Sequence, residues 1–178
     1  MKKVLFLIVL VSSIGYSQTQ ISGFKLVDKK VKWQHVFEVT NYPADSLQQI
    51  FITNVLSKIN TNNLNELPHR VTFTINNDEV DFRKYGGKWG NTWLFVEYAL
   101  NYFVIIDFKD NKYRVTCSDV KTVFIPPLGV FKLNNTATKK RQTIFTTNKT
   151  VLRGLSYLEK HLKGKFNLKT ALKENNNW

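Results

Sequence analysis

The fold of this chain is decided by the stretch YALNYFVIIDFKDNKYRVTCSD, residues 98–119. An apolar run rich in β-branched and aromatic residues is followed by the polar turn KDNK and a second β-rich run, which is typical of a β-hairpin. A turn centred on Asp110 and Asn111 places three apolar pairs on one face: Phe108 with Tyr113, Ile106 with Val115, and Val104 with Cys117. On the opposite face Asp107 pairs with Arg114, and this charge pair supports the register.

The segments before the hairpin predict one helix and further strands. Four segments alternate between apolar and polar residues as strands do: residues 33–39, 70–75, 79–83 and 92–97. Pro43 and Asp45 suit the first turn of a helix that ends at residues 60–63. Its apolar stripe consists of Leu47, Ile50, Phe51, Val55 and Ile59, whereas Leu56 points away from it. This order predicts an α+β protein in which a curved antiparallel sheet packs against a helix.

The whole chain divides into six parts by composition. We expect a signal peptide over 1–17, a leader over 18–32, an α+β domain over 33–123, a polar basic linker over 124–147, a helix over 148–164 and a loose tail over 165–178. Asn148 suits the start of the last helix and Gly164 its end. Its narrow apolar stripe consists of Val151, Leu155, Leu158 and Leu162. We therefore expect an additional amphipathic C-terminal helix.

Two motifs indicate a family. FEVTNYPADSLQQIF is a strand that enters a helix, and YFVIIDFKDNKYRVTCSDV is the hairpin with its Lys-Asp-Asn turn. Together they resemble a family of secreted bacterial proteins, a domain of unknown function with a TATA-box-binding-protein-like (TBP-like) fold. The resemblance covers residues 33–123, and it departs from the family's Asp-Gly-Arg-Tyr-Arg pattern at Asn111 and Lys112. It implies a strand–helix–strands fold and export, and it implies no activity or catalytic residues.

The first residues predict an exported protein. Lys2 and Lys3 precede the apolar run 4–11, and small residues at positions 15 and 17 suit cleavage by signal peptidase after Ser17. The apolar run is far shorter than the ~20 residues that span a bilayer, so we expect no transmembrane segment in the mature chain. No cysteine follows the run, which argues against a lipoprotein. We expect a periplasmic or secreted protein.

The charge of the chain restricts the class of partner. There are 26 Lys and Arg residues against 13 Asp and Glu residues, a net charge of +13. This excess favours anionic partners such as acidic glycans or lipid head groups. Nucleic acid is not an expected partner, because export takes the protein away from the chromosome. Cys117 is the single cysteine, which excludes an internal disulfide, and we expect it to be a buried apolar residue.

A glycine-rich loop at residues 85–91 carries the best candidate for a ligand-binding surface. This surface would consist of Tyr85, Trp89, Trp93, Arg83 and Lys88. Aromatic rings on an adaptable loop stack on sugar rings or bases, and the two cations add charge. The alternative, which we favour, is that the rings close one end of the core.

We predict no catalytic constellation, metal site or cofactor. His35, His69 and His161 lie far apart in the sequence, and none is paired with another ligand type at helical spacing. The acidic groups within residues 78–81 flank a turn, which we interpret as solvated rather than as an acid–base pair. The segment Gly86-Gly87-Lys88 lacks the spacing of a phosphate-binding loop.

Basic residues near the C-terminal helix are candidates for contact with an anionic surface: Lys139, Lys140, Arg141, Lys149, Arg153 and Lys160. We expect the helix itself to pack on the sheet and leave these groups solvated. The function we expect is a non-catalytic binding or structural module of the cell envelope. Two alternatives are a small hydrolase of an envelope polymer and a peripheral protein of anionic membranes. A pair of carboxylates, or a His–carboxylate pair, converging in a pocket would favour the hydrolase.

Overall fold

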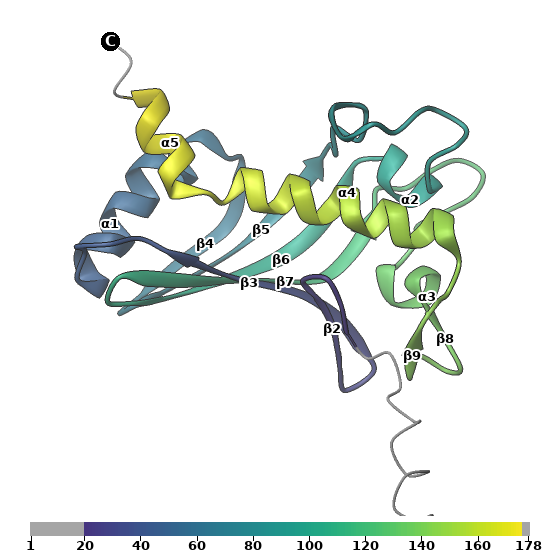
Figure 1. Ribbon diagram of the computed structural model, residues 1–178, viewed down its shortest axis with the longest axis horizontal. Helices are drawn as coiled ribbons and strands as arrows, with labels where there is room; N and C mark the ends of the chain where they lie inside the picture. Colours follow the sequence, from purple (N-terminus) through teal and green to yellow (C-terminus); the bar gives the residue numbers. More distant parts are fainter. Residues whose placement is uncertain (1–19, 176–178) are drawn as a thin grey trace, which may run out of the picture.

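The structure, a computed structural model, describes residues 20–175, so the predicted signal peptide lies outside the described residues. Seven strands form one antiparallel sheet in the order β1-β2-β3-β7-β6-β5-β4 (Figure 1). The strands are β1 Gln20–Ile21, β2 Phe24–Val27, β3 Lys30–Glu38, β4 Thr61–Leu67, β5 Arg70–Asp78, β6 Leu100–Lys109 and β7 Lys112–Thr122. A small second sheet pairs β8 Thr138–Lys139 with β9 Ile144–Phe145. The α+β prediction is confirmed.

The central hairpin has the predicted register. Its strands β6 and β7 pair Val104 with Cys117, Ile106 with Val115, Asp107 with Arg114, and Phe108 with Tyr113. The side chains of Ile106 and Cys117 are fully buried, whereas Asp107 on the other face accepts a 2.7 Å hydrogen bond from Arg114 Nη2. Alternation of side chains along each strand thus gives the sheet one buried face and one face toward solvent.

Helices cover the buried face of the sheet. They are α1 Ala44–Asn54, α2 Leu94–Glu97, α3 Leu133–Ala137, α4 Lys149–Lys165 and α5 Leu168–Asn175, with 3-10 turns η1 Leu56–Lys58 and η2 Arg83–Tyr85. The long helix α4 lies across the sheet, and α5 reaches α1 at the left of Figure 1. Asn148 caps α4 as predicted, because its Oδ1 accepts from the backbone N–H groups of Thr150 and Val151. Leu155 and Leu158 are fully buried, so the apolar stripe of α4 packs in the core.

Three local predictions before the hairpin are wrong. Leu56 is 5% exposed, because the tight turn η1 rotates it from the predicted outer side of the helix into the core. Residues 79–83 form no strand; Val80 and Phe82 are buried from an irregular segment that leads into η2. Residues 92–97 were predicted as a strand, but Leu94–Glu97 form the short helix α2. In addition, the exposed edge strand β4, Thr61–Leu67, was not predicted; residues 60–63 were expected only to end the first helix.

The predicted leader, linker and tail all belong to the folded unit. The leader supplies β1, β2 and the start of β3, with Phe24 fully buried. Leu133 and Ala137 of α3, inside the predicted linker, are fully buried as well. The predicted loose tail contains α5, whose Leu168 is also fully buried. These parts look polar in sequence because their few core residues are scattered among polar ones. Within residues 20–175 no helix combines the length and the apolar character needed to cross a bilayer.

Candidate functional site

The predicted aromatic surface is divided between two environments. Trp89 is 55% exposed; its ring meets Phe82 edge-on, and the Arg83 guanidinium lies 5.5 Å from its centroid. Trp93 instead stacks on Phe95 with ring centroids 4.8 Å apart. A Cβ atom on Gly154 of α4 would lie 2.7 Å from the Trp93 ring, so this ring packs tightly on α4. Trp93 closes the core, while Trp89 and Arg83 form a small exposed pair.

The two remaining members of that set also lie apart. Tyr85 is half-buried at the end of η2, with the ammonium group of Lys160 lying 5.8 Å from its ring centroid. Lys88 is exposed, and its backbone N–H donates to Thr92 Oγ1 at 3.1 Å. The loop is thus held by local contacts, and its five candidate side chains lie in different local environments.

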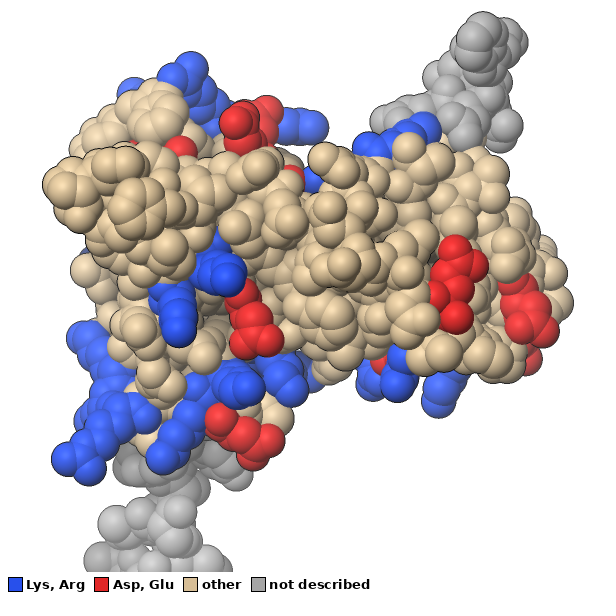
Figure 2. Space-filling model, turned by 180° about the vertical axis from the view of Figure 1, so that it is seen from behind, with Lys and Arg blue, Asp and Glu red and all other residues tan. Residues whose placement is uncertain are grey.

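All six basic residues predicted to contact an anionic surface are exposed. Lys140 and Arg141 have positive φ angles in the turn between β8 and β9, beside Lys139. Lys149 and Arg153 lie in the first half of α4, while Lys160 lies further along it, beside Tyr85. Lys and Arg gather at the lower left of Figure 2, the end of the molecule at which β2, β8 and β9 lie in Figure 1.

A buried polar cluster joins the end of β5 to α4. Asp78 Oδ2 accepts a 2.5 Å hydrogen bond from the Tyr102 hydroxyl and lies 3.0 Å from His161 Nε2. Asp78 Oδ1 forms a 2.7 Å ion pair with Lys165 Nζ. The Asp78 side chain is only 5% exposed, and those of His161 and Lys165 are 14% and 20% exposed. Every oxygen of this buried carboxylate is therefore matched by a donor, as burial of a charge requires.

Electrostatics keep Asp78 ionised. Burial acts to raise the pKa of its carboxyl, but the hydrogen bond from His161 and the charges of His161 and Lys165 outweigh burial and lower that pKa. Burial and the negative charge of Asp78 raise the pKa of Tyr102 well above its ordinary value. Tyr102 therefore stays a neutral donor, and Asp78 stays an acceptor.

His161 and Lys165 also line a cleft of about 420 Å³. The cleft lies between the end of α1, the segment around η2, the end of α4, and α5, and its other lining residues are Asn54, Val55, Lys58, Ile59, Asp81, Lys84, Tyr85, Gly164, Asn167, Thr170 and Ala171. The predicted solvated turn at residues 78–81 is thus wrong for Asp78, although Asp81 is exposed. Sequence reasoning missed the cluster because its members come from distant segments, and the isolated histidine gave no signal.

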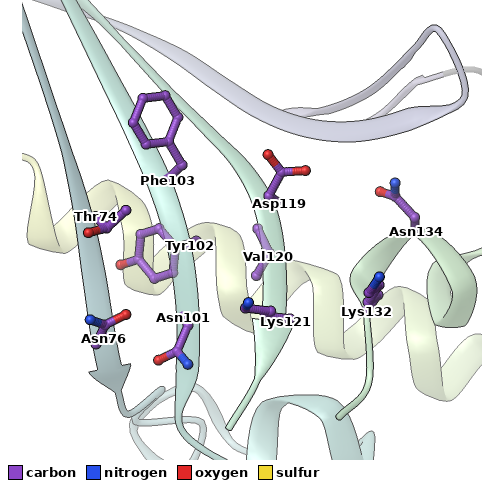
Figure 3. Close-up of a pocket in the computed structure, with 10 residues that line it drawn as sticks. All are labelled: Thr74, Asn76, Asn101, Tyr102, Phe103, Asp119, Val120, Lys121, Lys132 and Asn134. Atoms are coloured by element: carbon purple, nitrogen blue, oxygen red, sulfur yellow. The ribbon is translucent and has the colours of Figure 1, made fainter.

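A second hollow, of about 320 Å³, lies on the open face of the sheet. It is lined by Thr74, Asn76, Asn101, Tyr102, Phe103, Asp119, Val120, Lys121, Lys132 and Asn134. Figure 3 shows these side chains coming from three neighbouring strands, from Lys132 just before α3 and from Asn134 in α3. None of them was predicted as a site residue, because outward strand residues such as Phe103 and Lys121 show no signal in a single sequence beyond alternation. Tyr102 and Val120 are 3% and 4% exposed, so they belong to the core and only border the hollow.

A β-bulge and two anchored side-chain amides shape the hollow. Asp119 has a φ of 52°, and the pairing of β6 with β7 shifts between Asn101 and Phe103, which is a β-bulge. Bulges turn a side chain out of the regular alternation, and this one places Asp119 on the rim beside Phe103. Asn101 Oδ1 accepts from the Asn77 backbone N–H at 2.8 Å, and Asn134 Oδ1 accepts from the Val31 backbone N–H at 2.8 Å. Both amides are held by their oxygens, so their NH₂ groups are free to donate.

Metal-ligand side chains do not gather within the part of the chain that the structure describes: no group of three His, Cys, Asp or Glu residues there could hold an ion. Cys117 is fully buried, and burial raises the pKa of its thiol well above the ordinary value. Its thiol is therefore an inert part of the core.

Comparison with known proteins identifies the fold. A TBP-like protein from Parabacteroides distasonis is similar with a TM-score of 0.55 and 12% sequence identity, over 81% of this chain and 95% of that chain. A DUF4468 family protein from Bacteroides ovatus gives a TM-score of 0.47 and 12% identity, over 88% of each chain. No family model and no curated protein matches the chain. The first similarity confirms the predicted TBP-like fold, and at this identity it shows the fold alone.

Proposed function

We propose that this protein is a non-catalytic binding module of the cell envelope that holds an acidic glycan in the hollow on the open face of its sheet. The observation that carries the proposal is the set of groups around Phe103. An aromatic ring, free amide donors, one carboxylate and two ammonium groups surround a single hollow of about 320 Å³.

Each group matches a part of an acidic sugar. The apolar face of a pyranose ring packs on an aromatic ring such as Phe103. The NH₂ groups of Asn101 and Asn134 donate to hydroxyl and acetamido oxygens, while Asp119 accepts from hydroxyl groups. Lys121 and Lys132 carry positive charges at the hollow and pair with sugar carboxylates. The overall charge of +13 favours such a ligand at long range.

The lining of the hollow favours binding over catalysis. Its ten residues include no histidine, serine or cysteine, and Asp119 is its only carboxylate. Glycoside hydrolysis ordinarily requires a pair of carboxylates on either side of the scissile bond. A single carboxylate with amides and lysines gives recognition without that chemistry.

Calorimetric titration with soluble cell-wall fragments, disaccharides of N-acetylglucosamine and N-acetylmuramic acid, tests the proposal. Phe103→Ala should weaken binding about fivefold, because ring stacking contributes on the order of 1 kcal/mol. Ile105→Ala is the matched control, since Ile105 lies two residues along on the same face but outside the hollow. No heat of binding for the parent, or equal losses in the two variants, would contradict the proposal.

A second candidate function, hydrolysis of an envelope polymer, is favoured by the Asp78–His161 pair. His161 lines the cleft of about 420 Å³ between α4 and α5, and an imidazole oriented by a carboxylate is a general base for activating water. Against this, Asp78 is also bound by Tyr102 and Lys165, which is the pattern of a buried structural network. Mass spectrometry of the same fragments after long incubation separates the two functions. Cleavage that His161→Gln abolishes would establish the hydrolase, and unchanged fragments would favour the binding module.

A further inference from the structure

One loop of the protein presents apolar side chains to solvent from a hydrogen-bonded turn. We call residues 123–131, with the sequence VFIPPLGVF, the apolar loop. Ile125 and Gly129 are joined by two backbone hydrogen bonds of 2.9 and 2.7 Å, which close the loop into a tight turn. At its base Thr122 donates its N–H to Phe131 O and accepts the Phe131 N–H on its Oγ1. The turn is thus fixed by the backbone rather than by packing of its tip.

The tip of the apolar loop is exposed. Phe124 is 67% exposed, Leu128 55% and Val130 46%. Of the large hydrophobic residues that the structure describes, Phe124 has the highest exposed fraction. Single exposed apolar residues are ordinary, but three in one short loop indicate a surface that is covered by something else.

The charge around the apolar loop is entirely positive along the chain. From Val120 to Leu158 the sequence contains no Asp or Glu, and the cations there are Lys121, Lys132, Lys139, Lys140, Arg141, Lys149 and Arg153. All seven are exposed. Lys121 and Lys132 face each other in an antiparallel bridge at the base of the loop. The apolar tip of the loop therefore lies next to the ammonium groups of Lys121 and Lys132 at its base.

We propose that the apolar loop and the cations around it dock this end of the protein on an anionic lipid bilayer. Phe124 and Leu128 enter the interface between head groups and acyl chains, and the basic side chains contact lipid phosphates. The charge selects lipid over an apolar protein groove, because a groove that receives Phe124 would give no partner to the five exposed cations outside the hollow, which are Lys139, Lys140, Arg141, Lys149 and Arg153. The helix α4 does not take this role through its apolar stripe, since Leu155 and Leu158 are buried in the core. Docking on the bilayer does not require a ligand in the hollow on the open face of the sheet.

Vesicle sedimentation tests the apolar part of this surface. The exported form of the protein, with the N-terminus of each variant determined by mass analysis, is mixed with vesicles of equal parts phosphatidylcholine and phosphatidylglycerol. Phe124→Ser combined with Leu128→Ser should lower the partition coefficient about tenfold or more. Leu64→Ser combined with Leu67→Ser is the matched control, because these residues of the edge strand β4 are 44% and 46% exposed. That control should bind as the parent does.

The same assay tests the charged part. Lys139→Gln combined with Lys140→Gln should weaken binding by about fivefold for each lysine. Lys109→Gln combined with Lys112→Gln, in the exposed turn of the central hairpin, should have no comparable effect. Vesicles of phosphatidylcholine alone, or an ionic strength of about 1 M, should weaken binding of the parent because the electrostatic attraction is then lost or screened.

A fluorescent label locates the contact. Leu128→Cys labelled with the environment-sensitive dye NBD should brighten and shift to shorter wavelength with the anionic vesicles. The parent is the labelling control, because Cys117 is buried. The proposal is overturned if the parent does not bind the anionic vesicles, or if the variant with serine at positions 124 and 128 binds them equally well. A parent that elutes as a dimer and does not bind vesicles, with a monomeric serine variant, would assign the loop to self-association and overturn it too.

Discussion

Asp78 Oδ2 lies 3.0 Å from His161 Nε2, although the two residues are 83 positions apart in the chain. Asp78 ends β5 and His161 lies in the last third of α4, so their contact ties the long helix to the sheet. Tyr102 and Lys165 complete the donor set of the carboxylate. This polar cluster lies on the buried side of the sheet, and the ionisation of its Asp78 carboxylate leads to the first prediction.

Asp78→Asn should lower the free energy of unfolding at neutral pH, and should lower it less in acid. The pKa of Asp78 is lowered in the folded state, so the ionised carboxylate contributes stability above the unfolded-state pKa of about 4. This contribution is lost as the pH falls through the lower folded-state pKa. We expect a loss of about 3 kcal/mol at pH 7, shrinking below about pH 4. Urea unfolding at both pH values checks this, with the exposed Glu38→Gln as control; a loss that does not change with pH would contradict it.

Tyr113→Phe should loosen α5. The Tyr113 hydroxyl donates to Phe166 O at 2.7 Å and accepts from the Leu168 N–H at 3.0 Å, so it bridges the break between α4 and α5. Losing this buried bridge should cost about 1–3 kcal/mol and speed hydrogen exchange at the Leu168 amide. Tyr98→Phe, at a half-buried ring before β6, is the control. Unchanged exchange at Leu168 would show that α5 is held by its apolar contacts alone.

Variants of two adjacent residues test the hairpin register. Ile106 is fully buried, so Ile106→Asp places an unpaired charge in the core and should cost several kcal/mol. Asp107 pairs with Arg70 and Arg114, but both arginines are about half exposed. Asp107→Asn should therefore cost about 1 kcal/mol or less. Urea midpoints measure both, and equal losses or the reverse order would be inconsistent with this register.

Replacement of Leu155 tests the docking of α4. Leu155 is fully buried, so Leu155→Ala should lose about 2–5 kcal/mol through lost burial and a cavity. Neutralising Lys149, Arg153 and Lys160 together should barely change the thermal midpoint, because all three are exposed. A Leu155→Ala variant as stable as the parent would mean that α4 is only weakly docked.

The hairpin was predictable because its information is local. The Asp110-Asn111 turn and the alternation on each side fix which residues pair, and the Asp107–Arg114 pair agrees with them. The burial of Leu155 followed from helical periodicity for the same reason. The helix α5 was not predicted, because its segment is mostly polar and has only two or three apolar residues. It is held by tertiary contacts: the Leu168 N–H donates to the Tyr113 hydroxyl, and Leu168 is buried in the core.

Neither site could be assembled from the sequence. The hollow requires the bulge at Asp119 and the arrival of Asn134 from a different segment beside β7. The buried cluster requires His161 to meet Asp78 across the whole fold. In both cases tertiary packing brings together residues that carry no motif. In the glycine-rich loop, Trp93 packs on α4, which agrees for this ring with the favoured interpretation that the rings close one end of the core.

The most direct test of glycan binding is a nuclear magnetic resonance titration that follows the side-chain NH₂ signals of Asn76, Asn101 and Asn134. On addition of the N-acetylglucosamine–N-acetylmuramic acid fragments, these three signals should shift together and saturate at one common affinity. The side-chain signals of Asn54 and Asn167, in the cleft beside His161, should stay in place. Shifts confined to Asn54 and Asn167, or no saturable shift at Asn76, Asn101 and Asn134, would contradict a glycan site on the open face of the sheet.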